Sequence, residues 1–400
     1  MKICLVRCPS PFLIDEWVFP PLGLMAVATG LKVRGHDVFI HDGPIAETPM
    51  DFQYYGFGPT SPEYSSSIEA MKLIRQHNPK AKLVIGGPYA TLKPTECVND
   101  GWDCVVHGNG EIVAESAFKD NLPIIIAKNL QLDEYPIIDR SLIDIKKYKF
   151  SMDGIHATSL ITSRGCPFSC GFCSKNYTKI RLMSAERIIE EIKILHFDFG
   201  FKALLFPEDI FIVDRKRVEK VCQYMKELGI IWRCLVRGDI TVKYGPSFVK
   251  MMKDSGCVEV GMGVESGSPK ILSNINKGES VESIKEAIRM LKKDGIRVKG
   301  FFIIGLPGES YETINETKQF LDEMKLDDID AKIFQPYPGS PIWEHKDLYD
   351  IDWDNNMDIS KTYYKGRPKE YYGNIRTSSL TTEQIYKAWI EIEDKYKRKD

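Results

Sequence analysis

Over residues 1–127, short apolar runs alternate with stretches that have the apolar spacing of amphipathic helices. This alternation favours a parallel sheet covered by helices on both faces, so we expect an α/β, Rossmann-like domain here. The segment between Asp42 and the third strand is too short for the usual helix. The predicted strands lie at 2–8, 37–42, 53–59, 82–88, 103–108 and 124–127, and the named helices lie at 22–35 and 64–79.

The loops that follow these strands are the candidate binding loops of the domain. Open parallel sheets bind their ligands at the carboxyl ends of the strands, where such loops gather. Glycine and proline are frequent in the loops, as turns and close backbone approach require. The candidate residues there are Cys8, Pro9, Asp42, Gly43, Gly86, Gly87, Pro88 and Gly108.

The alternation resumes with a longer rhythm at 158–340, after a connector at 128–157 that has little periodicity. Six strand–helix units point to a partial (β/α)6 TIM-like barrel, whose chemistry takes place at the carboxyl ends of its strands. The predicted strands lie at 159–163, 202–207, 231–237, 257–264, 297–305 and 329–335. The predicted helices lie at 184–196, 215–228, 245–255, 281–294 and 313–325.

Residues 341–400 form a small C-terminal extension that ends in a helix predicted at about 381–397. Ile385, Trp389, Ile392 and Tyr396 share one face of this helix. The part before the helix is rich in aromatic residues, which either cap the barrel mouth over a substrate or pack on the outside of the barrel. These residues are Trp353, Tyr363, Tyr364, Tyr371 and Tyr372.

Composition narrows the class of protein. The chain has 400 residues, 54 Lys and Arg against 56 Asp and Glu, and a net charge of -2, which argues against a broad nucleic-acid-binding surface. No apolar run approaches the roughly 18 residues of a membrane span. The start, MKICLVRCPSP, has a strand pattern and no secretory signal. We therefore expect a cytoplasmic protein whose ten cysteines are reduced thiols or metal ligands.

Three of the cysteines fall within eight residues, in the segment CPFSCGFC. Cys166, Cys170 and Cys173 are spaced so that their thiolates can converge on one metal centre. A structural zinc site would need a fourth ligand, whereas a 4Fe–4S cluster held by three cysteines keeps one iron open. The other seven cysteines are scattered, mostly in apolar segments, and are expected to be buried in the core.

At this point the sequence resembles the radical S-adenosylmethionine (SAM) superfamily. CPFSCGFC is similar to the C-x3-C-x-Φ-C signature of that family, with Phe172 in the aromatic position. The resemblance continues in order through LLFPEDIF (204–211), GCVEVGMGVESGSPKIL (256–272) and GFFIIGLPGES (300–310). It implies that the three cysteines bind a 4Fe–4S cluster, whose open iron chelates SAM so that an electron cleaves SAM to a 5′-deoxyadenosyl radical.

The resemblance also implies a set of residues that contact SAM. Glu265 and Arg237 would hold its charged or hydroxyl groups, although a salt bridge at the barrel end accounts for either residue equally well. Pro207-Glu208-Asp209 stands where the family more often has two aspartates, and these acids either face SAM or are solvated. The full set is Phe172, Glu208, Arg237, Glu265, Ser266, Gly305 and Pro307.

The front domain resembles the cobalamin-binding domain that precedes many radical SAM barrels. PPLGLMAVATGLKVRGHDV (20–38), GGPYATLKP (86–94) and LDEYPIID (132–139) carry the likeness. It implies a corrinoid across the loops at Cys8–Pro11, Asp42–Pro44 and Gly86–Tyr89. The D-x-H-x-x-G loop that supplies an axial histidine in other cobalamin proteins is missing, and Tyr89 replaces a frequent histidine. Cobalt is therefore expected to lack a histidine ligand from that motif.

These resemblances imply an enzyme of the branch that methylates unactivated carbons, with SAM as both radical source and methyl donor. One alternative is a radical SAM enzyme whose cobalamin domain is vestigial and whose reaction is cyclisation, dehydrogenation or epimerisation. Another is an iron–sulfur or zinc interaction module without catalysis. The expected partners are an unidentified small molecule or peptide and an electron donor such as flavodoxin or ferredoxin, without a membrane or extended nucleic acid.

Overall fold

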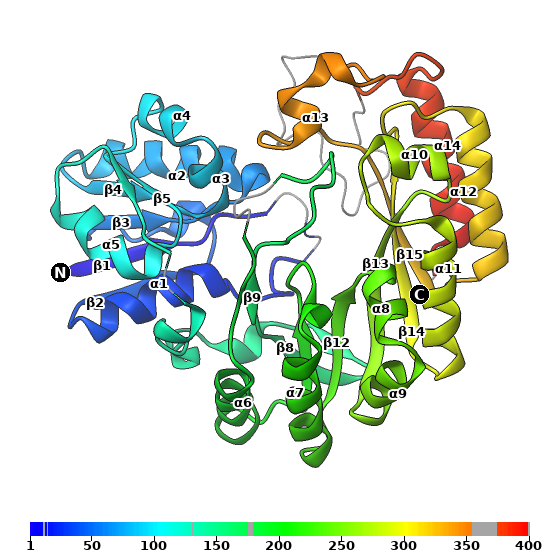
Figure 1. The fold of residues 1–400 in the computed structure, drawn as a ribbon. Coiled ribbons are helices and arrows are strands. Elements are labelled where there is room, and N and C mark those ends of the chain that lie inside the picture. Colours follow the sequence, from blue (N-terminus) through cyan, green and yellow to red (C-terminus); the bar gives the residue numbers. More distant parts are fainter. Residues whose placement is uncertain (11–12, 14, 130, 175–178, 354–373, 399–400) are drawn as a thin grey trace. The chain divides into compact units, whose positions relative to one another are not determined.

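Two sheets of mainly parallel strands organise the chain, and each belongs to a separate unit (Figure 1). The computed structural model describes residues 1–400 except 11–12, 14, 130, 175–178, 354–373 and 399–400. Among the described residues, the first unit comprises Met1–Phe150 and the second begins at Ser151. The fold class is therefore the predicted one, a parallel sheet followed by a partial barrel.

All six strands of the first sheet are parallel, in the order β2-β1-β3-β4-β5-β6. The strand order reverses between β1 and β3, which makes their carboxyl ends the place where a crevice opens in such a sheet. The strands are β1 (Lys2–Val6), β2 (Asp37–His41), β3 (Tyr54–Phe57), β4 (Lys82–Ile85), β5 (Cys104–His107) and β6 (Ile124–Ile126).

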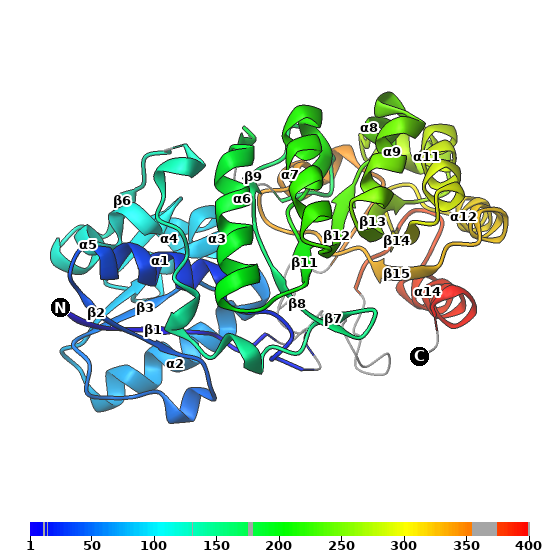
Figure 2. The same ribbon diagram turned by 90° about the horizontal axis from the view of Figure 1, so that it is seen from below.

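Helices cover both faces of this sheet because its strands are apolar on both sides. α1 (Leu22–Val33) and α5 (Gly110–Lys119) pack against each other on one face, and α2 (Tyr64–His77) lies on the other (Figure 2). Two short helices, α3 (Gly87–Leu92) and α4 (Pro94–Asn99), follow β4. A single 3-10 turn, Ile45–Glu47, connects β2 toward β3, which confirms that the usual helix is missing there.

The second sheet curls into a partial barrel with the order β15-β14-β13-β12-β11-β8-β7. Its first six strands in that order are parallel, and β7 adds an antiparallel edge. The strands are β7 (Ser151–Met152), β8 (Ile155–Ser159), β11 (Ala203–Phe206), β12 (Ile231–Val236), β13 (Cys257–Glu265), β14 (Arg297–Ile304) and β15 (Asp328–Ile333).

Helices line the convex side of this sheet (Figure 1). The predicted helices are present, and α8 and α10 are additional short helices at strand ends. They are α6 (Ala185–Lys193), α7 (Arg215–Glu227), α8 (Gly238–Tyr244), α9 (Pro246–Asp254), α10 (Pro269–Asn274), α11 (Val281–Lys293), α12 (Tyr311–Met324), α13 (Pro341–Glu344) and α14 (Thr382–Tyr396).

The first barrel strand lies earlier than predicted, at Ile155–Ser159 instead of 159–163. Asp153 and Gly154 both have positive φ, 48° and 77°, and they form the turn of a hairpin between β7 and β8. Asp-Gly is a strong signal for a two-residue hairpin turn, and this signal fixes where the strand begins. A second short hairpin, β9 (Ser163–Arg164) with β10 (Arg181–Leu182), follows and carries the cysteine segment.

The C-terminal helix α14 covers the last strand of the barrel. Trp389 Nε1 donates to the Ala331 carbonyl at 2.8 Å, and Glu393 Oε1 accepts from the Ala331 N–H at 2.7 Å. Ile385, Trp389 and Ile392 are buried, which confirms the predicted apolar face of this helix. Both backbone groups of Ala331 are thereby satisfied at a strand edge that would otherwise be open. Trp353 is also buried, and the four tyrosines at 363, 364, 371 and 372 lie outside the described residues.

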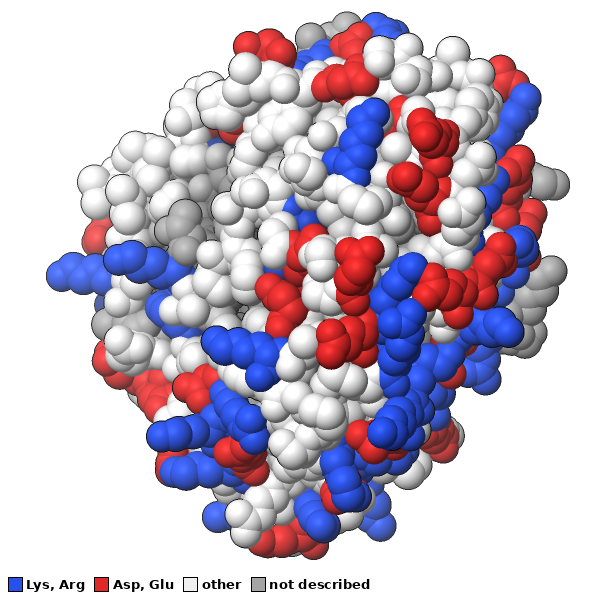
Figure 3. All heavy atoms as spheres, turned by 45° about the vertical axis from the view of Figure 1, so that its right-hand side comes forward, with Lys and Arg blue, Asp and Glu red and all other residues white. Residues whose placement is uncertain are grey.

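The described chain has no helix that could cross a membrane, and the face drawn in Figure 3 carries both acidic and basic side chains. Within the described ranges, the helices are all too short or too polar to cross a membrane. On the face drawn in Figure 3, acidic side chains interrupt the lysines and arginines. This distribution agrees with the nearly balanced charge of the sequence.

We predict that Gly87→Ala destabilises the protein more than Gly35→Ala. Both glycines have positive φ, 78° and 80°, so both variants carry a strain of about 1–2 kcal/mol. A Cβ on Gly87 would also meet the Gly58 backbone at 2.9 Å, whereas a Cβ on Gly35 meets nothing within 4 Å. The extra overlap should cost a further ~1–3 kcal/mol. The midpoints of urea unfolding measure the difference, and equal midpoints would contradict this account of Gly87.

Candidate active site

The cysteine segment is a loop held at the carboxyl side of the barrel sheet by backbone hydrogen bonds. Gly171 donates its N–H to the Ile275 carbonyl at 2.6 Å, and its own carbonyl accepts from the Ile342 N–H at 3.0 Å. Asn276 Nδ2 donates to the Ser169 carbonyl at 3.0 Å. A Cβ on Gly171 would lie 3.3 Å from the Ile275 carbonyl, so glycine is what allows this close approach.

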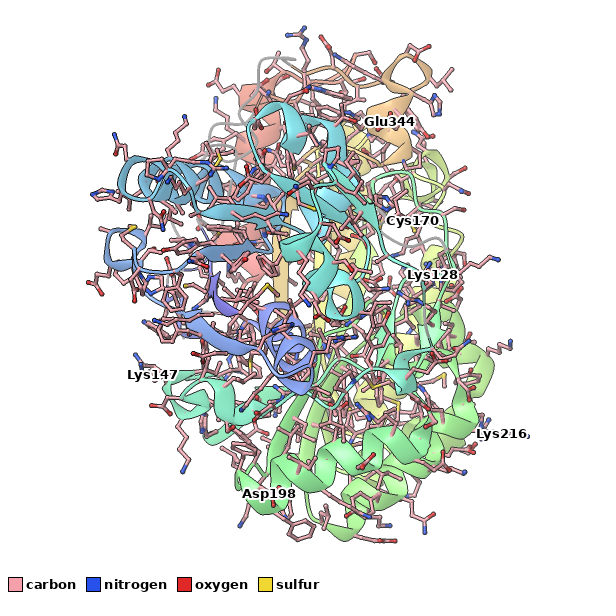
Figure 4. The ribbon with its side chains drawn as sticks, turned by 90° about the vertical axis from the view of Figure 1, so that its left-hand side faces the viewer. Lys128, Lys147, Cys170, Asp198, Lys216 and Glu344 are labelled. Carbon is pink, nitrogen blue, oxygen red and sulfur yellow. The ribbon has the colours of Figure 1, made fainter. Side chains whose placement is uncertain are left out.

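The loop brings the three cysteines into one region of the second unit. Cys170, labelled in Figure 4, is buried, and its Sγ lies 3.9 Å from the Lys277 carbonyl. Cys166 and Cys173 are partly exposed. In the described part of the chain, no group of three or more His, Cys, Asp or Glu side chains is positioned to hold a metal ion. Three thiols are the ligands that a 4Fe–4S cluster held by three cysteines needs. To bind the cluster, the three side chains must converge on it.

The other seven cysteines are unsuited to ligation because burial raises the pKa of each thiol above its ordinary value. Burial raises the pKa of Cys97 and Cys104 to about 11 and that of Cys4 and Cys222 to about 12. It also raises the pKa of Cys8, Cys234 and Cys257. Since the thiolate is the metal ligand, these residues stay as small apolar core residues, as predicted.

Glu208 lies beyond the end of β11 in a closed environment. Its Oε1 accepts from the Thr162 hydroxyl, and within the described chain its Oε2 has no hydrogen-bond partner. Burial raises the pKa of this carboxyl to about 7, opposed by the Thr162 hydrogen bond and by the charge of Arg217. The sequence left open whether Glu208 faces SAM or is solvated. Because its residue is only 6% exposed, the solvated alternative is wrong for Glu208.

Glu265 and Arg237 both stand at strand ends, and both take part in one buried chain of charges. Glu265 Oε1 pairs with Lys277 Nζ at 2.9 Å, and Lys277 Nζ lies 3.6 Å from Glu279 Oε2. Glu279 Oε2 is 3.3 Å from Arg237 Nη2, and Arg237 Nε pairs with Asp239 at 3.1 Å. Burial alone would lower the pKa of Lys277, but Glu265 and Glu279 raise it above its ordinary value. The amine therefore stays charged.

Lys277 and Glu279 belong to no motif that the sequence revealed. They follow α10 in the segment Asn276–Ser280, where charged residues ordinarily belong to a solvated loop. Lys277 and Glu279 alternate in charge with Glu265 and Arg237, which stand at strand ends. This arrangement is not visible in the sequence, because it arises only when the strands are paired. Ser266, which was predicted to contact SAM, is buried and makes a 3.1 Å hydroxyl contact with Thr317 of α12.

The turn after β14 is built around a buried carboxylate. Gly305 has φ 87° and donates its N–H to Glu309 Oε2, and Pro307 accepts from Asn274 Nδ2 at 3.0 Å. A Cβ on Gly305 would lie 3.1 Å from Ile385 Cγ2, so this glycine also makes room for α14. Glu309 is fully buried, and its Oε1 has no hydrogen-bond partner among the described residues. Burial raises its pKa to about 7.

Two cavities open at the carboxyl edge of the first sheet. One of about 620 Å³ lies at the ends of β1 and β2 and another of about 220 Å³ at the ends of β1 and β3. The larger cavity is lined by Arg7, Pro9, Asp15, Glu16, Trp17, Asp42, Gly43, Pro44, Ile45 and Lys149, and the smaller one includes Cys8 and Gly58. The loops at Cys8–Pro9 and Asp42–Pro44 therefore meet at cavities, as predicted for ligand-binding loops, and position 11 lies outside the described residues.

An ion pair supports the larger cavity. Arg7 Nη1 pairs with Asp42 Oδ1 at 2.9 Å, and the Tyr148 hydroxyl donates to Asp42 Oδ2. The Arg7 guanidinium lies 5.8 Å from the Trp17 ring and 5.9 Å from the Tyr148 ring. No histidine lines either cavity among the described residues, and His41 Nε2 is 3.0 Å from the Pro44 carbonyl.

Gly86, Gly87, Pro88 and Gly108 do not line these cavities. Gly86 precedes α3, Gly87 and Pro88 begin it, and Gly87 packs against the Gly58 backbone. Gly108 has φ 98° and donates its N–H to Thr91 Oγ1 at 3.1 Å. Local structure therefore accounts for these residues, and the predicted contact of Gly86 and Gly87 with a corrinoid stays a prediction.

Comparison with known proteins agrees with this geometry. The family model described as the Radical SAM superfamily matches residues 160–321. An uncharacterized methyltransferase of Pyrococcus horikoshii is 32% identical over 389 residues, covering 86% of this chain and 83% of that protein. The chain belongs to the radical SAM superfamily. It is therefore an enzyme, and its superfamily cofactors are a 4Fe–4S cluster and SAM.

Other relatives and solved structures extend the likeness of this radical SAM enzyme. The anaerobic magnesium-protoporphyrin IX monomethyl ester cyclase of Cereibacter sphaeroides is 26% identical over 316 residues, with 71% of this chain and 51% of that protein covered. The fold is similar to that of the radical SAM methyltransferase TsrM from Kitasatospora setae. The TM-score is 0.68 at 15% identity, with 90% of this chain and 78% of that one covered.

We predict that Glu309→Gln removes a pH-dependent loss of stability. The folded pKa of about 7 exceeds the ordinary value of 4.5, so the folded state binds the proton more tightly. The contribution of Glu309 is thus fully present below pH 4.5 and is lost as pH rises through 7, by up to about 3 kcal/mol. The variant should gain in Tm relative to wild type between about pH 5 and pH 8.5. Glu312→Gln, at an exposed position of α12, is the control, and parallel Tm profiles of Glu309→Gln and wild type would refute the assignment.

Proposed function

We propose that the chain is a cobalamin-dependent radical SAM methyltransferase that acts at an unactivated carbon. The observation that carries this proposal is the combination, in one chain, of a three-cysteine loop on a radical SAM barrel and cavities at the carboxyl edge of a parallel front sheet. Comparison with two similar proteins supports it. One is called a methyltransferase, and the structure of the other contains cobalamin and a [4Fe-4S] cluster.

Within this proposal, the cluster and SAM belong to the second unit. Cys166, Cys170 and Cys173 hold the cluster, since these three share one short loop and the remaining cysteines are scattered through the chain. Glu265 and Arg237, at adjacent strand ends, place charged groups beside the cysteine loop through Lys277 and Phe168. The proposed SAM-contacting set is Phe172, Glu208, Arg237, Glu265, Ser266, Gly305 and Pro307.

Cobalamin belongs to the first unit in this proposal. The cavities at the ends of β1, β2 and β3 form the proposed corrinoid-binding site, which is lined by Cys8, Pro9, Asp42 and Gly43. Gly86, Gly87, Pro88 and Gly108 support that edge by shaping the loops behind it. Because no histidine lines the cavities in the described residues, these loops would supply no histidine ligand to a bound corrinoid.

When bound, cobalamin supplies the methyl group that a substrate radical takes up. In the proposed overall reaction, R–H, two SAM and two electrons give R–CH3, 5′-deoxyadenosine, methionine and S-adenosylhomocysteine. The hydrogen of R–H leaves with the 5′-deoxyadenosyl group, and the methyl group comes from the second SAM. The protein binds and orients these groups and excludes water from them. The electrons would come from a small redox protein such as flavodoxin or ferredoxin in the cytoplasm.

A reaction without methyl transfer is the second candidate, because one relative is named a cyclase. Both reactions share the cleavage of SAM and differ in whether S-adenosylhomocysteine accompanies 5′-deoxyadenosine. The substrate in either case is a small molecule or peptide. The ratio of the two products with a given substrate therefore distinguishes the candidates.

We predict that Cys166, Cys170 and Cys173 are all required for the cluster. Anaerobic reconstitution should give about four irons and four sulfides per chain, as a 4Fe–4S cluster requires. The triple Cys→Ala variant should lose nearly all of this iron, and with it the formation of 5′-deoxyadenosine. Cys222→Ala and Cys257→Ala, at buried core positions, serve as controls that should retain the iron. A triple variant that keeps most of its iron would exclude this ligand set.

We predict that Ile45→Trp abolishes corrin uptake and leaves the cluster intact. Ile45 lines the cavity of about 620 Å³, so an indole there competes with any occupant. Ile126→Trp, at a position 74% exposed on β6 of the same sheet, is the control that should still take up corrin. Absorption spectra after anaerobic reconstitution with hydroxocobalamin measure the bound corrin. Equal corrin content in the two variants would place the corrin elsewhere, and a wild-type protein without corrin would favour the non-methylating candidate.

A further inference from the structure

The end of β13 contains a strained turn whose central residue is Glu265. Glu265 has φ 64°, a region that residues other than glycine seldom adopt. The pairing register between β13 and β14 shifts between Gly263 and Glu265, which is the pattern of a β-bulge. The Ser266 N–H donates to the Val264 carbonyl at 2.8 Å and closes a three-residue turn. Bulges of this kind re-aim a side chain, and such a turn with positive φ is strained.

Lys277 is the partner toward which Glu265 is aimed. Their 2.9 Å ion pair is buried, with 6% and 9% of the respective side chains exposed. A Cβ on Gly263 would lie 2.4 Å from Glu265 Oε1 and 3.0 Å from Lys277 Nζ, so the glycine makes space for the pair. β13 thus has glycine at position 263, where a strand-favouring residue would leave no room for the ion pair.

The same chain of charges reaches the cysteine loop from the other side. The Arg237 guanidinium lies 3.5 Å from the centre of the Phe168 ring, and Phe168 stands between Cys166 and Cys170. Arg237 Nη2 also donates to the Lys277 carbonyl at 3.1 Å, the carbonyl that Cys170 Sγ approaches at 3.9 Å. Glu279, whose side chain is fully buried, accepts the Asp239 N–H at 3.0 Å and lies near both cations.

We propose that Lys277 and Glu279 are positioning residues that set the strained Glu265 turn and the Phe168 segment of the cysteine loop relative to each other. Glu279 holds Lys277 and Arg237 together, Lys277 holds Glu265, and Arg237 holds Phe168. The proposal rests on the proposed cleavage of SAM at this site, because its consequence is the orientation of SAM relative to the cluster.

Stability alone does not explain such an arrangement. Removing several charges from water is costly, and replacing a buried ion pair with apolar residues is often neutral or stabilising. The attraction among the five charged residues is therefore largely offset by the free energy that their removal from water costs. Fixed geometry is the property that they supply, because each cation contacts two carboxylates from different segments.

The experiment compares Lys277→Met and Glu279→Gln with Lys299→Met and Glu259→Gln. The controls break ion pairs on neighbouring strands outside the cysteine region, Lys299–Asp328 at 2.6 Å and Arg233–Glu259 at 2.9 Å. Lys277→Met and Glu279→Gln should keep the iron content but slow SAM cleavage at saturating SAM by about 10- to 100-fold, as small misplacements of reacting groups do. The EPR spectrum of the reduced cluster with SAM should also change, and Lys277→Arg should recover most of the rate.

Equal cleavage rates and unchanged EPR spectra in Lys277→Met and Glu279→Gln would overturn the inference. So would a loss of rate that the two controls share, since it would reflect general destabilisation. If Lys277→Met does not fold, Glu279→Gln decides the question, because it preserves the shape of the side chain and removes only its charge. The wild-type protein tests the proposed function separately. If it holds an intact cluster and makes no 5′-deoxyadenosine, the proposed function is refuted.

Discussion

Parallel pairing of strands is the constraint on which both units depend. A parallel strand returns to its starting edge through a crossover, so the loops that follow all strands of a sheet gather on one side. In the first unit this gathering produces the cavities between the loops after β1, β2 and β3. In the second unit it brings the ends of β12 and β13 to the cysteine loop, although Arg237 is 69 residues from Phe168 in sequence and Lys277 is 107 residues from Cys170.

The sequence predicted what repeats along the chain and missed what depends on pairing. Periodicity located the strands of the first sheet and most strands of the second, because each is apolar on alternate or on all positions, but it missed the two-residue strand β7 inside the predicted connector. It misplaced β8, since the run from Ile155 to Thr162 permits several strand boundaries and the Asp153-Gly154 turn was overlooked. The spacing of Cys166, Cys170 and Cys173 indicated the cluster motif, yet nothing in the sequence shows that Lys277 and Glu279 lie beside it. Their contacts arise from the β13 bulge, which alternating patterns do not encode.

Glycine shows why residue type alone underdetermines function. Gly87 and Gly305 occur in segments for which the resemblance implies contact with a cofactor, and Gly171 lies in the cysteine segment. The structure gives each a different neighbour: the Gly58 backbone, the Ile275 carbonyl and the Ile385 side chain. A glycine required for packing and one required for a ligand look identical in a single sequence, and only the atoms opposite the missing Cβ distinguish them.

The coverage of β15 by α14 has a consequence for how the barrel assembles during synthesis. The open edge of β15 exposes the Ala331 backbone until Trp389 and Glu393 are present to occupy it. A nascent chain that has already formed β15 therefore carries an unpaired strand edge while the following segment is still being made. Such an edge invites pairing with another chain until α14 has been made and covers β15.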